Sequence, residues 1–435
     1  MGSFALCTLR ASTADGNDSS YAHRDYTIDA LTKRDKAMSN PANGPMQGVR
    51  VLDLGSMIAG PAAASILADQ GADVIKVEPT GSGDVMRYLG ATRGGVSGLY
   101  HACNRGKRSI ALDMKTDEGR AIVHSLIDQV DVVLHNYRDG VAERLGIDYQ
   151  TLSSHNPNII YLWVNGFGES GPMAGKPAYD SVIQAYTGVA QSQSDHHTGE
   201  PIQYYQLFSD KLTALTGAQA IAAALYAKAS GRGGQYISLA MVDAVISFMW
   251  VDTAGAATFV GEDVNPGMHL SRNPVTRFSD GWITLSPLTD SQFHGCCSAF
   301  GIDSSAPELA TVQDRMANPD FYRELLASIE VAASLMTVEE GLKRLSERDV
   351  PAAPAQFLSD LPADEQLKHN GTFTTTQHPH GGLMVEPVNP PNFSQTPSGA
   401  GAPCALLGQH TDDILQSIGY TPERIETLRA AAVIA

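Results

Sequence analysis

The stretch from Val51 to Pro79, VLDLGSMIAGPAAASILADQGADVIKVEP, most constrains the fold of this chain. Residues 51–54 form a short, mainly apolar run that ends at Gly55, residues 59–69 are rich in alanine, and residues 72–78 contain the β-branched residues typical of a strand. Two strands joined through a helix pair in parallel with a right-handed crossover. The stretch therefore predicts the start of a Rossmann-like α/β fold with a parallel sheet.

Two glycine-containing segments bear on whether this fold binds a dinucleotide. The turn GSMIAGP, after the first strand, lacks the G-x-G-x-x-G spacing that seats a pyrophosphate on a helix N-terminus. The segment GFGESG at residues 166–171 has that spacing, but Pro172 and Pro177 follow it where a helix would have to begin. We therefore reject a dinucleotide site and expect residues 166–171 to form a loop beside a ligand.

Composition limits the class of protein. With 435 residues, 43% of them hydrophobic, the chain exceeds the usual size of one domain. The net charge of -17 argues against binding to nucleic acid or to an anionic membrane. No apolar run reaches the length of about 20 residues that spans a bilayer, and the first residues do not resemble a secretory signal. The five cysteines predict no disulfide framework. We expect a cytoplasmic protein, with an organellar matrix left open.

Alternating strand and helix patterns divide the chain into five parts. Residues 1–45 lack periodicity and predict a mobile N-terminal extension. Residues 46–240 alternate strands with helices and predict a large Rossmann-like domain. We expect a linker helix over 241–264, a smaller α+β domain over 265–355, and a return segment over 356–435 whose C-terminal helices pack on the large domain.

Several motifs in one order resemble a known family. They include AGPAAASILADQGADVIKVEP, NRGKRSIALDMKTDEGR, DVVLHNYRDGVAERLGIDYQTLSSHNPNIIYLWVNGFGESGP and PAYDSVIQAYTG. These motifs closely resemble the class III CoA-transferases, the CaiB/BaiF family, strongly over residues 47 to about 250 and more weakly to the C-terminus. The resemblance implies transfer of CoA from an acyl-CoA thioester to a free carboxylic acid. It also implies that the CoA thioester is a substrate, with no permanently bound cofactor, and that two subunits form an interlocked homodimer.

Asp210 is the first catalytic candidate. Ser209 is expected to cap a helix over residues 210–230, and the N-terminus of a helix favours an ionised carboxylate. The local sequence alone is equally consistent with an acid whose only role is to stabilise its helix. The resemblance implies more: Asp210 attacks the thioester, forms a mixed anhydride and then carries CoA as an aspartyl-CoA thioester.

Tyr179 and Asp180, in KPAYDSVIQAYTG, are expected near the substrate. Asp180 can equally be the N-cap of the helix that it opens. In the related acyl-CoA racemases, a histidine that acts as acid and base occupies the position resembling Tyr179. A tyrosine, with an ordinary pKa near 10, suits exchange of an α-proton poorly, so the residue favours a transferase.

The CoA contacts are predicted in two ways. The densest basic cluster, around Arg105 and Lys107, suits the phosphates of CoA, although such a cluster is often a solvated surface. The resemblance adds contacts at Leu112, Asp113, Met114, Lys115, Asn136, Tyr137, Arg138 and Arg144, with Met57 and Ile58 lining the entrance. Formyl-CoA transferases have a glutamine at the position of Ile58 and a later run of glycines. Because this chain has PGMHLSRNP there, oxalate or formate specificity is not expected.

Other chemistries receive little support. His196, His197, His378 and His380 lie in polar or proline-rich stretches without a matching ligand set, so no metal site is predicted. No G-x-S-x-G motif indicates a hydrolase. Three readings stay open: a CoA-transferase, an acyl-CoA racemase or carnitine-type enzyme of the same family, and a CoA-binding scaffold without catalysis.

Overall fold

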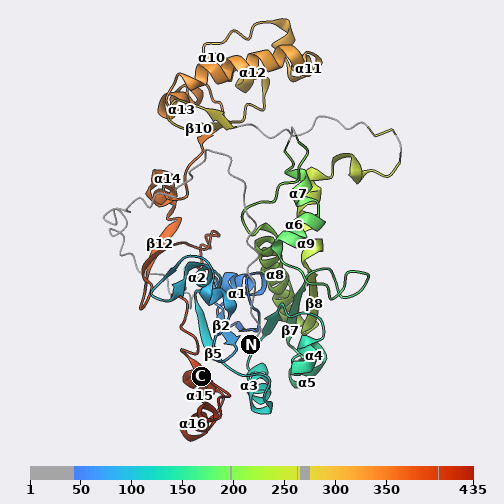
Figure 1. Cartoon of the computed structure of the whole chain (residues 1–435), viewed down its shortest axis with the longest axis vertical. Coiled ribbons are helices and arrows are strands. Elements are labelled where there is room, and N and C mark those ends of the chain that lie inside the picture. The colour runs from blue at the N-terminus through green and yellow to red at the C-terminus, as the bar shows by residue number, and fades with distance from the viewer. Residues whose placement is uncertain (1–43, 196–197, 262, 265–274, 400) are drawn as a thin grey trace, which may run out of the picture.

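The computed structural model describes residues 44–195, 198–261, 263–264, 275–399 and 401–435 (Figure 1). The predicted extension over residues 1–45 therefore lies almost wholly outside the described residues, as do His196 and His197.

A six-stranded, wholly parallel sheet forms the centre of the large domain. From one edge to the other its strands are β5 (Lys107–Ala111), β2 (Asp73–Glu78), β1 (Arg50–Asp53), β6 (Val132–His135), β7 (Ile160–Asn165) and β8 (Gln235–Ala240). Counted along the chain this order is 3-2-1-4-5-6, the doubly wound order of Rossmann folds. The predicted Rossmann-like parallel sheet is confirmed, and the chain reverses direction across the sheet between β1 and β6.

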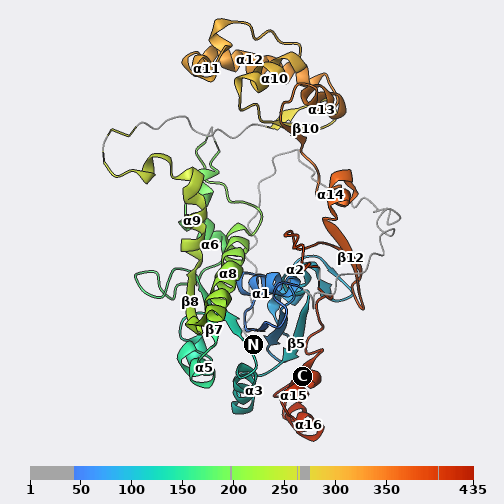
Figure 2. The same cartoon turned by 180° about the vertical axis from the view of Figure 1, so that it is seen from behind.

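Helices cover both faces of the sheet, as a parallel sheet requires. One face carries α3 (Asp117–Ile127), α4 (Val141–Leu145), α5 (Tyr149–His155), α15 (Thr411–Ser417) and α16 (Pro422–Ala430). The other carries α1 (Ala59–Asp69), α6 (Asp180–Tyr186), α7 (Val189–Ser192), α8 (Phe208–Ala227) and α9 (Met241–Thr253). Figure 1 and Figure 2 show α1 and α8 side by side.

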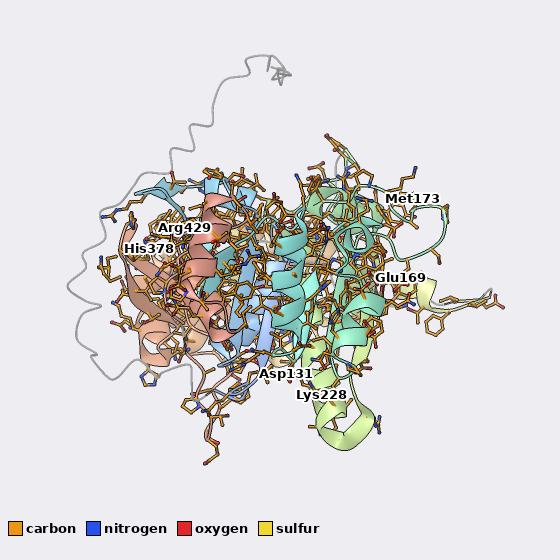
Figure 3. The ribbon with its side chains drawn as sticks, turned by 90° about the horizontal axis from the view of Figure 1, so that it is seen from below. Asp131, Glu169, Met173, Lys228, His378 and Arg429 are labelled. Atoms are coloured by element: carbon orange, nitrogen blue, oxygen red, sulfur yellow. The ribbon has the colours of Figure 1, made fainter. Side chains whose placement is uncertain are left out.

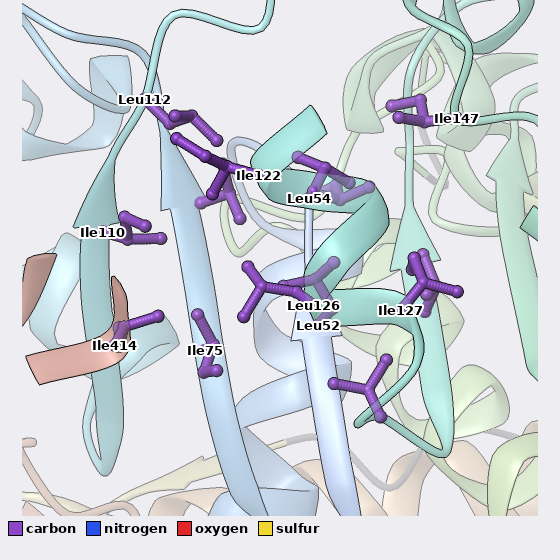
Figure 4. Packing of buried hydrophobic residues seen from close by; sticks show 14 of the residues in the cluster. Leu52, Leu54, Ile75, Ile110, Leu112, Ile122, Leu126, Ile127, Ile147 and Ile414 are labelled. Atoms are coloured by element: carbon purple, nitrogen blue, oxygen red, sulfur yellow. The ribbon is translucent and has the colours of Figure 1, made fainter. Parts of the chain in front are cut away.

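The core on the α3 face joins distant parts of the chain (Figure 4). Leu52 of β1, Ile75 of β2 and Ile110 of β5 pack with Leu126 of α3 and with Ile414 of α15. Burying an aliphatic side chain of this size contributes about 1.5–3 kcal/mol. The C-terminal residues therefore complete the core of the large domain.

A smaller body contains the antiparallel sheet β11-β10-β9 (Figure 1). Its strands are β9 (Val275–Arg277), β10 (Trp282–Leu285) and β11 (Ala352–Pro354), and its helices are α10 (Asp290–Ala299), α11 (Val312–Ala317), α12 (Pro319–Ser334) and α13 (Val338–Ser346). Phe278, Phe293 and Leu345 belong to its own hydrophobic core. The body thus has mixed α and β structure with antiparallel pairing.

The return segment contacts the large domain through polar groups as well. It contains α14 (Glu365–Asn370) and a hairpin of β12 (Phe373–His378) and β13 (Gly382–Pro387). His101, on α2 (Gly98–Asn104), lies 2.9 Å from the Glu386 carboxylate, and both side chains are buried. Further on, Leu112 forms a β-bridge with Ile434. A short hairpin, β3 (Thr92–Arg93) and β4 (Val96–Ser97), precedes α2.

Helix α8 differs from the expected one at its start. It begins at Phe208, and Leu207 occupies the N-cap position without a side-chain cap. The prediction that Ser209 caps this helix is therefore wrong. At the other end, Lys228 donates to Asp131 at 2.8 Å, and this pair lies next to the amino end of β6 (Figure 3).

Candidate active site

A cavity of about 330 Å³ lies where several strands of the parallel sheet end. Its walls come from the turn after β1, the segment after β6, the loop after β7 and the start of α8. The side chains that the argument below uses are Met57, Asn136, Arg138, Glu169, Lys176, Tyr179 and Asp210. The carboxyl ends of parallel strands, beside the point where strand order reverses, are where doubly wound folds bind ligands.

Asp210 occupies the third position of α8 and lines this cavity. Its backbone N–H donates to the Oδ2 atom of Asp180 at 3.0 Å. Burial, and secondly the charge of Asp180, raise the pKa of Asp210 to about 7. We expected the helix N-terminus to favour the ionised carboxylate, but burial and the neighbouring carboxylate outweigh that effect.

Asp180 belongs to α6 but accepts a hydrogen bond from α8. It is buried, it is the first residue of α6, and its Oδ1 atom accepts a hydrogen bond from the Gln184 side chain. Gln184 in turn accepts the N–H of Tyr204 at 2.9 Å. Asp180 therefore does not cap its own helix. It supplies an acceptor for an N–H in the first turn of α8, where the first four N–H groups lack a partner within the helix.

Tyr179 and the glycine loop form the outer wall of the cavity. Tyr179 is 60% exposed and lines the cavity directly before the buried Asp180. The loop after β7 is fixed at its start, because the Oδ1 atom of Asn165 accepts the N–H of Gly168 at 2.6 Å. As expected, residues 166–171 lead into no helix, since the next one, α6, begins at Asp180.

Met57 and Ile58, both expected at the entrance, have different surroundings. Met57 lines the cavity and has a φ of 63°, which is rare for a residue with a side chain. Ile58 is buried in an apolar cluster with Met86 and Tyr100 and does not line the cavity. Of the two, only Met57 reaches the cavity.

The residues expected to contact CoA fall into three groups. Asn136, Tyr137 and Arg138 line the cavity. Leu112, Asp113, Met114, Lys115 and Arg144 follow β5 or belong to α4, outside the cavity wall. Leu112 is buried, whereas Lys115 and Arg144 are exposed.

Arg105 and Lys107 form the third group, and both are engaged inside the protein. Arg105 makes a two-pronged pair with Asp69 at 3.0 and 2.6 Å. Lys107 is buried and lies 2.7 Å from Asp53. The cluster around Arg105 is therefore not one exposed basic patch, because Arg105 and Lys107 are paired with carboxylates inside the protein.

Sequence reasoning missed Lys176 and Met241 as wall residues, whereas Glu169 belongs to the loop over residues 166–171 that was expected beside a ligand. Lys176 was detectable as a basic residue four positions before Asp180, but nothing in the sequence indicates that Met241, at the start of α9, reaches the same cavity. Within the described ranges, no group of three or more potential metal ligands gathers. Among these residues too, no helix is both long and apolar enough to cross a membrane.

Comparison with known proteins identifies the family. The model of CoA-transferase family III matches residues 46–411. The chain belongs to CoA-transferase family III. Its relatives include a succinate–glutarate CoA-transferase of Agrobacterium fabrum, 34% identical over 88% of this chain and 98% of the relative. A succinyl-CoA:mesaconate CoA-transferase of Haloarcula hispanica is 31% identical over 88% of this chain and 99% of the relative.

Solved structures of the family have the same fold. A CaiB/BaiF family protein from Brucella suis is 30% identical, with a TM-score of 0.76 over 86% of this chain and 100% of that chain. A hypothetical protein, Rv3272, from Mycobacterium tuberculosis is 26% identical, with a TM-score of 0.74 over 87% of this chain and 100% of that one. This member of CoA-transferase family III is accordingly an enzyme that transfers CoA between an acyl-CoA and an acid.

Proposed function

We propose that this CoA-transferase uses Asp210 as a covalent nucleophile. One observation carries the proposal: Asp210 is a carboxylate in the cavity at the carboxyl ends of the strands, with its backbone fixed by Asp180. Although the pKa of Asp210 is raised to about 7, about half of the carboxylate is still ionised at neutral pH and able to attack.

The reaction then proceeds in balanced steps. A carboxylate oxygen of Asp210 attacks the thioester carbonyl, the C–S bond breaks, and a mixed anhydride and CoA thiolate result. The thiolate attacks the Asp210 carbonyl, forms the aspartyl-CoA thioester and releases the first acid as its carboxylate. The carboxylate of the incoming acid attacks that thioester, the C–S bond breaks, and a second mixed anhydride and CoA thiolate result. CoA thiolate finally attacks the substrate carbonyl of this anhydride, which yields the new acyl-CoA and regenerates Asp210.

Two Asp210 variants and a trapping reagent test this proposal. Asp210→Ala and Asp210→Asn should lower kcat at least about 10³-fold, since each removes the nucleophile. Hydroxylamine added to wild-type protein with an acyl-CoA should leave a hydroxamate on residue 210, detectable by peptide mass. Asp131→Asn, at the opposite end of the strands, serves as the control and should retain transfer. Full activity of Asp210→Ala would eliminate the proposal.

Deuterium exchange and the hydroxylamine experiment separate the other two interpretations. An acyl-CoA racemase would exchange the α-hydrogen of a chiral acyl-CoA with deuterium from solvent without moving CoA to another acid. We propose transfer in preference because Tyr179 stands where those enzymes have a histidine. A scaffold without catalysis would yield no hydroxamate with any acyl-CoA.

We propose that CoA lies along the cations outside the buried pairs, namely Lys115, Arg138 and Arg144. Among the described residues none of the three has an ion-pair partner within 4 Å, so each is available to a phosphate. We further propose the cytoplasm as the compartment. The buried, unpaired thiols of Cys103, Cys296, Cys297 and Cys404 suit a reducing environment.

We propose small dicarboxylic acids as the substrate class. The relatives are named for succinate, glutarate and mesaconate, all of which carry two carboxylates. The cavity of this chain also contains Lys176, and a carboxylate distant from the reacting centre needs such a cation. A panel of acyl-CoAs and free acids, with products identified by mass, tests the class. Exclusive use of monocarboxylic acids would exclude it.

We propose that the working form is an interlocked homodimer. Helix α9 consists mainly of apolar residues, yet Phe248, Trp250 and Val251 are 55%, 50% and 88% exposed in the single chain. Large exposed apolar surfaces mark interfaces. Light scattering should give twice the chain mass even after dilution to nanomolar concentration. A monomer at every concentration would refute the dimer.

A further inference from the structure

The turn after β1, residues 55–57, has its backbone polar groups bound by side chains from elsewhere in the fold. Gly55 donates its N–H to Asp53 at 2.9 Å, and its carbonyl accepts from the Nζ atom of Lys76 at 2.8 Å. Ser56 exchanges two hydrogen bonds with the side chain of Asn136, at 2.9 and 2.8 Å. All of these groups belong to buried or half-buried residues.

Asp84 supplies the last acceptor and joins it to a buried cation. Its Oδ1 atom accepts the N–H of Met57 at 3.4 Å and that of Met86 at 3.0 Å. Its Oδ2 atom lies 3.2 Å from the Nζ atom of Lys76. Lys76 and Asp84 are both buried, at 1% and 4% exposure, so their charges depend on each other and on Asp53.

These hydrogen bonds determine whether the turn can bind a phosphate. In dinucleotide-binding proteins of this fold the N–H groups of the same turn hold a pyrophosphate. Here the N–H groups of Gly55, Ser56 and Met57 are already bound to oxygens of Asp53, Asn136 and Asp84. None of these three backbone N–H groups is therefore left for a phosphate, and the turn is a fixed wall of the cavity.

The backbone conformation of Met57 is energetically unfavourable. Its φ of 63° places a residue with a side chain in the left-handed region, which typically costs about 1 kcal/mol or more and persists only where the surroundings impose it. The N–H of this residue is the group that Asp84 binds, and Met57 lines the same cavity as Asp210. Asp84 and Lys76 do not line the cavity themselves.

We propose that Lys76 and Asp84 are positioning residues for CoA transfer, which hold Met57 and the turn in the conformation that the cavity requires. The inference rests on the proposed function of Asp210, because it assigns the turn to the wall of the cavity that contains this nucleophile. It names residues outside the cavity that act through Gly55 and Met57. Displacing a wall by about 1 Å is enough to reduce turnover by about 100-fold.

Amide hydrogen exchange over residues 55–58 tests whether Lys76 and Asp84 hold the turn, and it needs no measurement of activity. Backbone amides there should exchange at least about tenfold faster in Lys76→Met and in Asp84→Ala than in wild type. Asp84→Asn keeps an acceptor, so its exchange rate should lie between those of wild type and Asp84→Ala. Arg315→Met is the matched control, because it also removes a buried cation from a carboxylate, Asp290 at 2.7 Å, but in the smaller body.

Kinetics test the functional half on the same folded variants. Lys76→Met and Asp84→Ala should lower kcat/KM by about 10- to 100-fold, while Arg315→Met should change only the unfolding midpoint. If Lys76→Met does not fold, Asp84→Asn provides the comparison. Wild-type exchange over residues 55–58, or control-like kinetics, in folded Asp84→Ala would overturn the inference. Full CoA transfer by Asp210→Ala, with the exchange difference present in the Asp84 and Lys76 variants, would instead overturn the proposed function.

Discussion

The Oδ2 atom of Asp180 accepts the backbone N–H of Asp210 at 3.0 Å, so two carboxylates face the first turn of one helix. This contact joins α6 to α8 and fixes the backbone of Asp210. It also brings a second negative charge close to the Asp210 carboxylate, and that charge adds to the effect of burial on its pKa.

Asp180→Asn should therefore move the pH dependence of transfer. For wild type, kcat/KM should rise with pH and level off above a midpoint near 7, because in the proposed mechanism only the ionised carboxylate of Asp210 attacks. The amide removes the neighbouring charge but leaves burial, so the midpoint should fall by about one pH unit. Rate profiles from pH 5 to 9 measure the shift, with Asp131→Asn as a control; an unmoved midpoint would contradict the assigned cause.

Asp210→Asn should stabilise the protein at alkaline pH. The folded-state pKa of about 7 lies above the ordinary value of 3.8, so the folded protein binds the proton more tightly than the unfolded chain does. Stability from this group is complete below pH 4 and is lost as pH rises to 7. The variant should thus gain up to about 4 kcal/mol at pH 8 and nothing at pH 4. Denaturant unfolding at both pH values checks this; an equal change at both would contradict it.

The sequence predicted the strands and helices of the sheet because their signals are local. The boundaries of α1 agree with the alanine-rich stretch, and those of β2 agree within one residue, since burial on both faces and helix propensity act along short segments. The start of α8 was misplaced, because Ser209 resembles a cap but Asp180, distant in sequence, supplies the acceptor. Such a partner leaves no local pattern.

The residues assigned from the family resemblance lie in the cavity more often than those assigned from charge alone. Asp210, the proposed nucleophile, and Arg138 were both assigned from the resemblance, and both line the cavity. Arg105 and Lys107 were assigned to CoA because they are basic and adjacent, but their partners Asp69 and Asp53 come from other elements. The pairing of buried charges is a property of the packed fold.

Arg105→Met and Arg138→Met should consequently differ. Arg105→Met leaves the buried Asp69 without its partner and should destabilise folding by about 3–5 kcal/mol. Arg138→Met removes an exposed cation of the cavity and should raise KM for acyl-CoA about tenfold, with little change in unfolding. Urea unfolding and steady-state kinetics distinguish them. A larger KM effect from Arg105→Met than from Arg138→Met would return Arg105 to the CoA site.

Gly166→Ala should impair catalysis through a close contact across the cavity wall. A Cβ atom at residue 166 would lie 2.4 Å from the Cβ atom of Ala178, a distance that forces one segment to move. Ala178 is two residues before Asp180, so the displacement should reach the hydrogen bond from Asp210 and lower kcat by about 10- to 100-fold. Gly98→Ala is the control, since its Cβ would meet only the Ala91 carbonyl at an ordinary 3.7 Å, outside the cavity. If Gly166→Ala lowered the unfolding midpoint but kept the kcat of the control, the loop and Asp180 would be independent, and the wall after β7 would serve stability alone.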